Sequence, residues 1–156
     1  MSASENIEDT GPQATTKEVE LTPAQTKQWE DTMSMMVWNA PGFQHLLYKL
    51  LNAQNDGRKH VAIMTREIGN AATDSKHVLV NPDWYFALTL PERVYILGHE
   101  IIHNVYGDVE LLHRCRTAGK VPMHDGTSMP FDEGTMQRSM DFRINALLNE
   151  SRIGRA

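Results

Sequence analysis

The sequence predicts a mostly helical α+β domain with a small antiparallel sheet. Three observations support this class. Apolar residues recur at helical spacing in segments that begin with capping residues and prolines. Only two short runs, at residues 61–64 and 77–80, are rich in β-forming residues. The length of 156 residues fits one domain with a substantial core.

The N-terminal part of the chain divides into a tail and two helices. Residues 1–20 are polar and lack apolar periodicity, so we predict a disordered tail, followed by a folded domain over residues 21–156. Thr22-Pro23-Ala24-Gln25 combines a capping box with an early proline and should open the first helix. Pro41-Gly42 ends it, and a second helix should follow over residues 43–51.

Two short strands are expected next, at Val61-Ala62-Ile63-Met64 and His77-Val78-Leu79-Val80. They lie about a dozen residues apart, with loop-forming residues at 69–75 between them. We therefore expect them to pair antiparallel. Asp83-Trp84-Tyr85-Phe86 should then form a short helical turn that buries aromatic rings.

The helix after these strands carries the most informative motif. Thr89-Leu90-Pro91-Glu92 is typical of a capped helix start, and Gly107 is typical of a helix end. Between them lies His99-Glu100-Ile101-Ile102-His103, the H-E-x-x-H pattern of zinc hydrolases. Residues four apart on a helix lie one turn up and about 40° round, so both imidazoles can reach one metal ion. The apolar residues form a separate stripe: Val94, Leu97, Ile101, Val105 and Val109.

The residue types of this motif suit metal-assisted hydrolysis. Zinc accepts neutral imidazole nitrogen and, in catalytic sites, keeps a position for water. Glu100 follows the first histidine and can act on that water as a general base. We therefore predict one Zn²⁺ per chain, with His99 and His103 as ligands and Glu100 as the catalytic residue.

The third ligand stays open between two acidic residues, because catalytic zinc usually has three protein ligands. Asp108 could reach the metal only if Gly107 turns the chain back. Asp141 and Asn145 lie four apart on a helix predicted around residues 136–150, away from its apolar stripe. This spacing favours Asp141 as ligand, with Asn145 hydrogen-bonding a metal histidine. Both aspartates could contribute, one as a ligand and one holding a histidine.

Two further histidines are weaker candidates. His113 would lie roughly 15 Å from His103 along a continuous helix, which is too far to share a metal. His124 falls in a segment without helical or strand pattern.

Composition limits the compartment and the partners. The net charge of −5 gives no general electrostatic reason to bind nucleic acid or anionic membrane. No apolar run is long enough to span a bilayer, and the N-terminus lacks the features of a signal peptide. The single cysteine, Cys115, excludes an internal disulfide and a thiolate-rich zinc site. We expect a cytoplasmic protein.

Several motifs in this order carry a family resemblance. They are Ala72-Thr73-Asp74-Ser75, Val78-Leu79-Val80-Asn81-Pro82, the H-E-x-x-H helix and Asp141-Phe142-Arg143-Ile144-Asn145. Over about residues 41–156 the chain resembles the metallopeptidase domain found N-terminal to von Willebrand factor A-like domains in bacterial and phage proteins. The resemblance implies a zincin-like fold, a zinc peptidase activity on a peptide or protein substrate, and a von Willebrand factor A-like domain as a partner in a longer chain.

The chain departs from that family pattern in three places. The family usually has another histidine where this chain has Asp108, although aspartate is also a competent zinc ligand. Residues 121–130 form a longer segment than usual, and family members continue where this chain ends, so we expect a truncated or minimal domain. The alternative function is a metal-stabilised binding or assembly module without turnover. A closed site with four ligands (His99, His103, Asp108 and Asp141) would favour that alternative.

Overall fold

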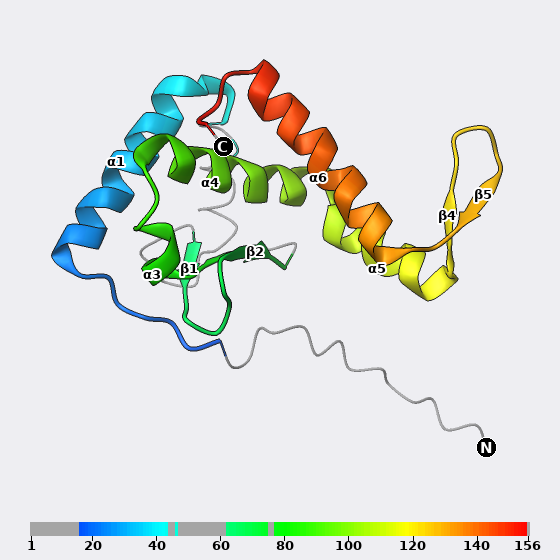
Figure 1. Ribbon diagram of the computed structural model, residues 1–156, viewed down its shortest axis with the longest axis horizontal. Helices are drawn as coiled ribbons and strands as arrows, with labels where there is room; N and C mark the ends of the chain where they lie inside the picture. The colour runs from blue at the N-terminus through cyan, green and yellow to red at the C-terminus, as the bar shows by residue number, and fades with distance from the viewer. Residues whose placement is uncertain (1–15, 44–45, 47–61, 75–76, 156) are drawn as a thin grey trace.

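The computed structural model describes residues 16–43, 46, 62–74 and 77–155. The fold is mixed α+β, and helices predominate (Figure 1). The helices are α1 (Pro23–Asn39), α3 (Pro82–Tyr85), α4 (Leu90–Tyr106), α5 (Asp108–Ala118) and α6 (Glu133–Glu150). The strands are β1 (Ala62–Met64), β2 (Ala71–Thr73), β3 (Val78–Val80), β4 (Lys120–Pro122) and β5 (Ser128–Pro130). Among the described helices, none is long and apolar enough to cross a membrane.

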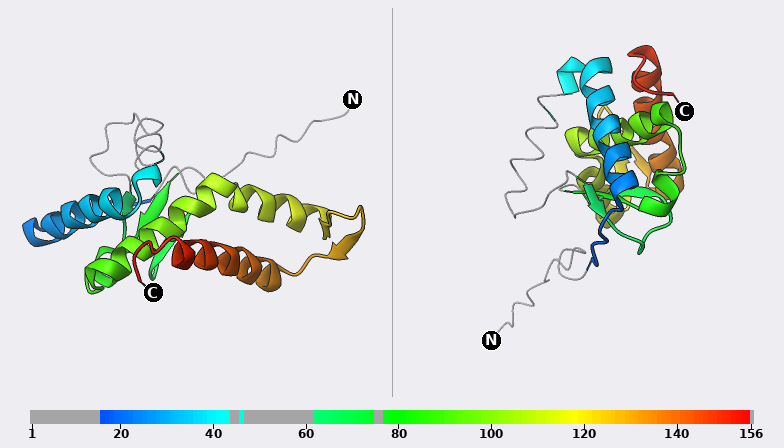
Figure 2. Two further views of the ribbon diagram at one scale, coloured as in Figure 1. Left: turned by 90° about the horizontal axis from the view of Figure 1, so that it is seen from above. Right: turned by 90° about the vertical axis from the view of Figure 1, so that its left-hand side faces the viewer.

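Helix α4 lies at the centre of the molecule and contacts α1, α5, α6 and strand β2 (Figures 1 and 2). Its first turn is capped by the residues that the sequence predicts. The Glu92 carboxylate accepts hydrogen bonds from the backbone N–H and the hydroxyl of Thr89, both at 2.7 Å. The helix ends at Gly107, whose φ of 65° lies in the left-handed region that favours glycine.

The buried face of α4 supplies a large part of the core. Its buried apolar side chains are Val94, Tyr95, Leu97, Ile101 and Ile102. Gly98 lies on the same face, and a Cβ there would meet Leu148 of α6 at 3.2 Å. The glycine therefore lets α6 pack closely against α4. Val105 is 50% exposed and Val109 is half-buried in α5, so the buried stripe of α4 ends at Ile101 and Ile102.

The three-stranded sheet corrects the predicted strand pairing. Strand β1 pairs with β3 in parallel, with Ile63 opposite Leu79, whereas the sequence predicts an antiparallel pair. The reason is an additional strand, β2, which occupies part of the predicted loop and pairs antiparallel with β3. Because β2 reverses the chain before β3 begins, β3 runs in the direction of β1. The sheet is therefore mixed, in the order β1-β3-β2, and only its β2–β3 half is antiparallel.

The described part of the chain begins within the predicted tail. Residues 1–15 of the predicted tail lie outside the described residues. Residues 16–20 are described, and the Val19 N–H donates to the Met64 carbonyl oxygen at 2.7 Å, so this part of the predicted tail lies against β1. Helix α1 starts with the predicted capping box of Thr22 and Gln25. The helix predicted over residues 43–51 falls almost entirely outside the described residues.

A hairpin of β4 and β5 joins α5 to α6 and projects at one end of the molecule (Figures 1 and 2). The sequence analysis did not predict these strands. Their residues and the turn between them are exposed except for Val121, which is half-buried. Helix α6 follows, capped by the Asp132 carboxylate, which accepts from the Thr135 N–H at 2.7 Å. Its buried residues are Met140, Ile144 and Leu148, which recur at helical spacing.

Candidate metal centre

Helix α4 places His99 and His103 side by side. The two residues are four apart, so their side chains leave the same face of the helix on consecutive turns. Their Nε2 atoms lie 3.0 Å apart, and the rings meet edge to face with centroids 4.7 Å apart. Both rings lie away from the buried apolar face of α4. The side chain of His99 is 15% exposed and that of His103 is 14% exposed. The predicted pairing of these histidines on one face is therefore present.

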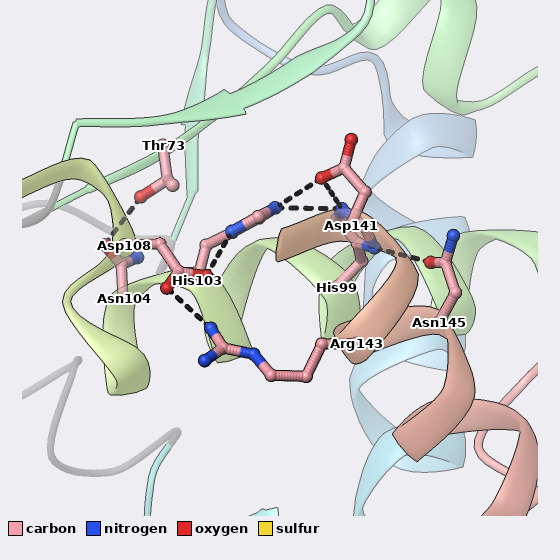
Figure 3. A network of polar contacts seen from close by, with 8 residues as sticks. All are labelled: Thr73, His99, His103, Asn104, Asp108, Asp141, Arg143 and Asn145. Carbon is pink, nitrogen blue, oxygen red and sulfur yellow. Dashed lines mark hydrogen bonds and ion pairs between the residues drawn. The ribbon is translucent and has the colours of Figure 1, made fainter. Parts of the chain in front are cut away.

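Helix α6 brings Asp141 to the same point. Its Oδ1 atom lies 3.0 Å from Nε2 of His103 and 3.3 Å from Nε2 of His99 (Figure 3). One ligand atom from each of the three residues lies within 4.8 Å of the others, which makes this group able to hold a metal ion. The sequence favoured Asp141 because it lies off the apolar stripe of its helix, and the structure places it beside both histidines.

The remaining nitrogen of each histidine contacts an oxygen. His99 Nδ1 lies 2.9 Å from Oδ1 of Asn145, and His103 Nδ1 lies 2.9 Å from Oδ2 of Asp108. An amide or carboxylate oxygen accepts hydrogen bonds, so each Nδ1 carries the proton in the neutral ring. The Nε2 atoms then present lone pairs. This pattern is typical of metal-binding histidines, whose second nitrogen donates to a protein oxygen.

The chemistry of this donor set fits a cation. With both Nδ1 atoms protonated, the two Nε2 atoms and the Asp141 oxygen are three acceptors that converge without a hydrogen between them. Such a cluster is repulsive unless a positive charge lies among its atoms. Burial, and secondarily the charge of His103, lowers the pKa of His99, which favours the neutral form that binds metals. The residues present therefore fit a divalent metal ion bound by nitrogen and oxygen.

Asp108 does not join the three converging atoms. Gly107 turns the chain, as the sequence allowed, but the turn brings the Asp108 carboxylate to Nδ1 of His103 rather than to Nε2. The residue is only 2% exposed, and its second oxygen accepts from Nη2 of Arg143 at 2.6 Å. The two candidate aspartates therefore lie in different places: Asp141 contacts the Nε2 atoms of both histidines, and Asp108 contacts Nδ1 of His103.

Glu100 lies between the histidines in sequence and is half-buried, and the charges of His103 and Asp141 act on its carboxyl group. Burial raises its pKa to about 7; the His103 charge opposes this rise, and the Asp141 charge adds to it. A carboxyl group with a pKa near neutrality can both take up and release a proton under ordinary conditions. The remaining histidine candidates lie apart from this group. His113 is exposed on α5, and His124 is exposed in the turn of the β4–β5 hairpin.

The sequence analysis did not predict the contacts of Arg143 and Thr73. The Arg143 guanidinium bonds Asp108 and lies over the Tyr106 ring, 4.2 Å from its centroid. Thr73 Oγ1 of β2 lies 2.6 Å from Oδ1 of Asn104 on α4, which ties the sheet to the helix that bears the histidines (Figure 3). The only sequence signal for Arg143 was its position between Asp141 and Asn145.

Comparison with known families agrees with this geometry. A family model described as "Putative metallopeptidase domain" matches residues 24–153. The chain belongs to this family. The match spans α1 to the end of α6 and therefore includes every residue of the candidate centre. The metallopeptidase family and the His-His-Asp cluster both indicate metal binding. No curated protein and no solved structure gives a significant match to the chain.

Proposed function

We propose that the protein is a zinc-dependent peptidase of the H-E-x-x-H type with a zincin-like site. His99, His103 and Asp141 would hold the metal, and Glu100 would be the general base. The observation that carries the proposal is the convergence of two histidine nitrogens and one aspartate oxygen at a site whose charges also act on Glu100. A bound zinc ion supplies Lewis-acid polarisation of the scissile carbonyl and lowers the pKa of a bound water.

Glu100 moves the proton in this proposal. Its carboxylate takes one proton from the attacking water as the water oxygen bonds to the carbonyl carbon. It then gives that proton to the leaving amine nitrogen as the C–N bond breaks. A pKa of about 7 suits both transfers, because neither form of the carboxyl group is strongly favoured near neutral pH.

The edge of the sheet supports a peptide substrate. In the β2–β3 pair, the Asp74 N–H donates to the His77 oxygen and the Asn81 N–H donates to the Asn70 oxygen. Hydrogen-bonded and non-hydrogen-bonded positions alternate along such a pair, so Ala71 and Thr73 direct their backbone groups away from β3. Strand β2 is the edge of the described sheet and lies against α4. An extended peptide could pair with these groups as an added strand.

The alternative module without turnover is less well supported. A closed four-ligand site, with Asp108 as the fourth ligand, would have favoured that alternative. Asp108 instead contacts Nδ1 of His103 and Arg143. Three protein ligands leave a coordination position for water, as in catalytic zinc sites.

Metal content and hydrolysis test the proposal together. We expect about one zinc per chain by elemental analysis. The metal should be lost in His103→Ala and retained in His113→Ala, which removes an exposed histidine on α5 and is the matched control. Hydrolysis of a peptide library, followed by mass spectrometry, should vanish in Glu100→Gln while the zinc remains. Equal hydrolysis by wild type and Glu100→Gln would remove Glu100 from the mechanism. Absence of metal from the wild type after zinc addition would refute the site.

A proline substitution tests the role of the sheet edge. Ala71→Pro removes an N–H that points away from β3, so it costs no hydrogen bond within the sheet. We expect a raised KM for peptides, with unchanged zinc content. An unchanged KM would argue against pairing of the substrate with β2.

A further inference from the structure

We propose that Arg143 is a positioning residue of the metal centre, acting on His103 through Asp108. The inference rests on the proposed metal site and concerns a side chain outside its ligand set. Arg143 Nη2 donates to Asp108 Oδ1 at 2.6 Å, and Asp108 Oδ2 accepts from His103 Nδ1 at 2.9 Å (Figure 3). The three side chains form one continuous chain of contacts from α6 through α5 to α4.

The burial of Asp108 explains why it needs Arg143. Its side chain is only 2% exposed, whereas that of Arg143 is 49% exposed. An ionised carboxylate is costly to bury unless it is paired and its oxygens are hydrogen-bonded. His103 and Arg143 each satisfy one oxygen. Without the guanidinium, Oδ1 would lose its partner, and the carboxylate would gain by turning toward water. The His103 ring would then lose the acceptor that fixes its orientation.

Tyr106 holds the guanidinium in place. The ring of this residue, the last of α4, lies 4.2 Å from the Arg143 guanidinium carbon. A guanidinium stacked on an aromatic face has a defined plane, and its hydrogen-bond donors point in fixed directions. The contacts with Tyr106 of α4 and Asp108 of α5 therefore fix the position of the Arg143 guanidinium.

The position of Arg143 on α6 extends this effect to Asp141. The two residues are two apart, so their side chains leave the helix about 200° from each other. Asp141 reaches the histidine Nε2 atoms, and Arg143 reaches the first residue of α5. Together they limit rotation of α6 about its own axis. Arg143 thus helps to place the ligand on α6 as well as the ligand on α4.

Metal affinity and the spectrum of a bound ion test this role. The zinc affinity of the purified protein would be measured by competition with a chromophoric chelator, and the coordination geometry by the visible absorption of added Co²⁺. We expect Arg143→Gln to weaken zinc binding by about 10–100-fold and to alter the Co²⁺ bands. Arg143→Lys keeps the charge but loses the planar guanidinium, so its zinc affinity should lie between those of the wild type and Arg143→Gln. Arg138→Gln is the matched control, because Arg138 is exposed on the same helix and bonds Thr135 of that helix.

A double-mutant cycle tests the route through Asp108. If Arg143 acts through this carboxylate, Arg143→Gln should cost less than about twofold in affinity in a protein that already carries Asp108→Asn. An equal loss in both backgrounds would overturn the route. An affinity of Arg143→Gln within about twofold of wild type would overturn the inference itself.

The outcomes separate this inference from the proposed function. A wild-type protein that binds neither zinc nor Co²⁺ would refute the metal site, whatever Arg143 does. Thermal unfolding of the metal-free variants shows whether they fold. Should Arg143→Gln fail to fold, Arg143→Lys decides the question: weaker zinc binding with shifted Co²⁺ bands would support the inference, and wild-type values would overturn it.

Discussion

The two halves of the candidate metal centre are held in different ways. On one side, the His99 ring contacts the neutral amide of Asn145, and the neighbouring residue Gly98 packs against Leu148 of α6. On the other side, the His103 ring contacts the ionised pair of Asp108 and Arg143, where α4 meets α5. The first half is therefore fixed by packing and a neutral hydrogen bond, and the second half by charge.

Asp108, which is buried, and Glu100, which is half-buried, differ in the same way. Asp108 in the His103 half has an arginine partner at 2.6 Å. Burial raises the pKa of Glu100, which follows His99, to about 7. The charge of Asp108, which contacts His103, is therefore balanced by an arginine. Glu100, the residue proposed for proton transfer, has no such partner among the described residues and keeps a pKa near neutral pH. Four changes test this division, beginning with the largest expected effect.

Leu148→Ala should cause the largest loss of stability. This side chain is fully buried, and its Cδ2 lies next to Gly98. Replacing a buried leucine by alanine usually costs about 2–5 kcal/mol. The free energy of unfolding in guanidinium chloride measures the loss. Leu147→Ala, at a half-buried position of the same helix, should cost clearly less. Equal losses would show that packing at Gly98 does not dominate the His99 half.

Glu100→Gln should change how the stability of the metal-free protein depends on pH. The folded state keeps a proton on Glu100 up to a pKa of about 7, whereas the unfolded state releases it near 4.5. The resulting stabilisation is complete below pH 4.5 and is lost as the pH rises to about 7. Its size is at most on the order of 3 kcal/mol.

The difference between the two stability curves isolates this effect. Glutamine does not titrate, so the variant should lack the fall between pH 4.5 and 7. The lowered pKa of His99 acts in the opposite direction below pH 6.5, but it is present in both proteins. Parallel curves of unfolding free energy against pH would contradict the raised pKa of Glu100.

Asp108→Ala should weaken zinc binding by about 10–100-fold, because a charged hydrogen bond to His103 is lost and Arg143 loses its partner. Chelator competition measures the affinity. Asp125→Ala, in the exposed turn of the β4–β5 hairpin, is a control in which we expect no change. A loss of the same size in that control would point to a general effect of net charge.

Asn145→Ala should have the smallest effect of the four, about tenfold or less in zinc affinity, since it removes a neutral hydrogen bond to His99. The comparison of this variant with Asp108→Ala measures the difference between the halves directly. If Asn145→Ala lost as much zinc affinity as Asp108→Ala, or more, the His103 half would not be the more strongly held of the two.

Local patterns in the sequence predicted the framework of the site. Thr22 with Gln25, and Thr89 with Glu92, marked two helix starts, because a capping residue and its partner are only three residues apart. The spacing of His99 and His103 predicted a shared face, because residues four apart lie on the same side of a helix. Asp141 was favoured because it lies away from the buried stripe of its helix, and the structure places it at the histidines.

Features that depend on distant contacts could not be predicted in this way. The parallel pairing of β1 and β3 follows from β2, whose three residues include two alanines and carry little strand signal. The partner of Asp108 depends on the direction of the turn at Gly107, which the sequence does not specify. Arg143 is half exposed, and its role depends on residues from two other helices.

The β4–β5 hairpin suggests where this protein tolerates engineering. Residues 120–130 are exposed except for Val121, and the hairpin connects the ends of two helices that already contact each other. Lengthening such a connection adds only a small entropic cost, about 0.6 kcal/mol for each doubling of its length. An epitope tag or a fluorescent label inserted at Asp125-Gly126 would therefore report on the folded protein without disturbing the helices that carry the candidate metal centre.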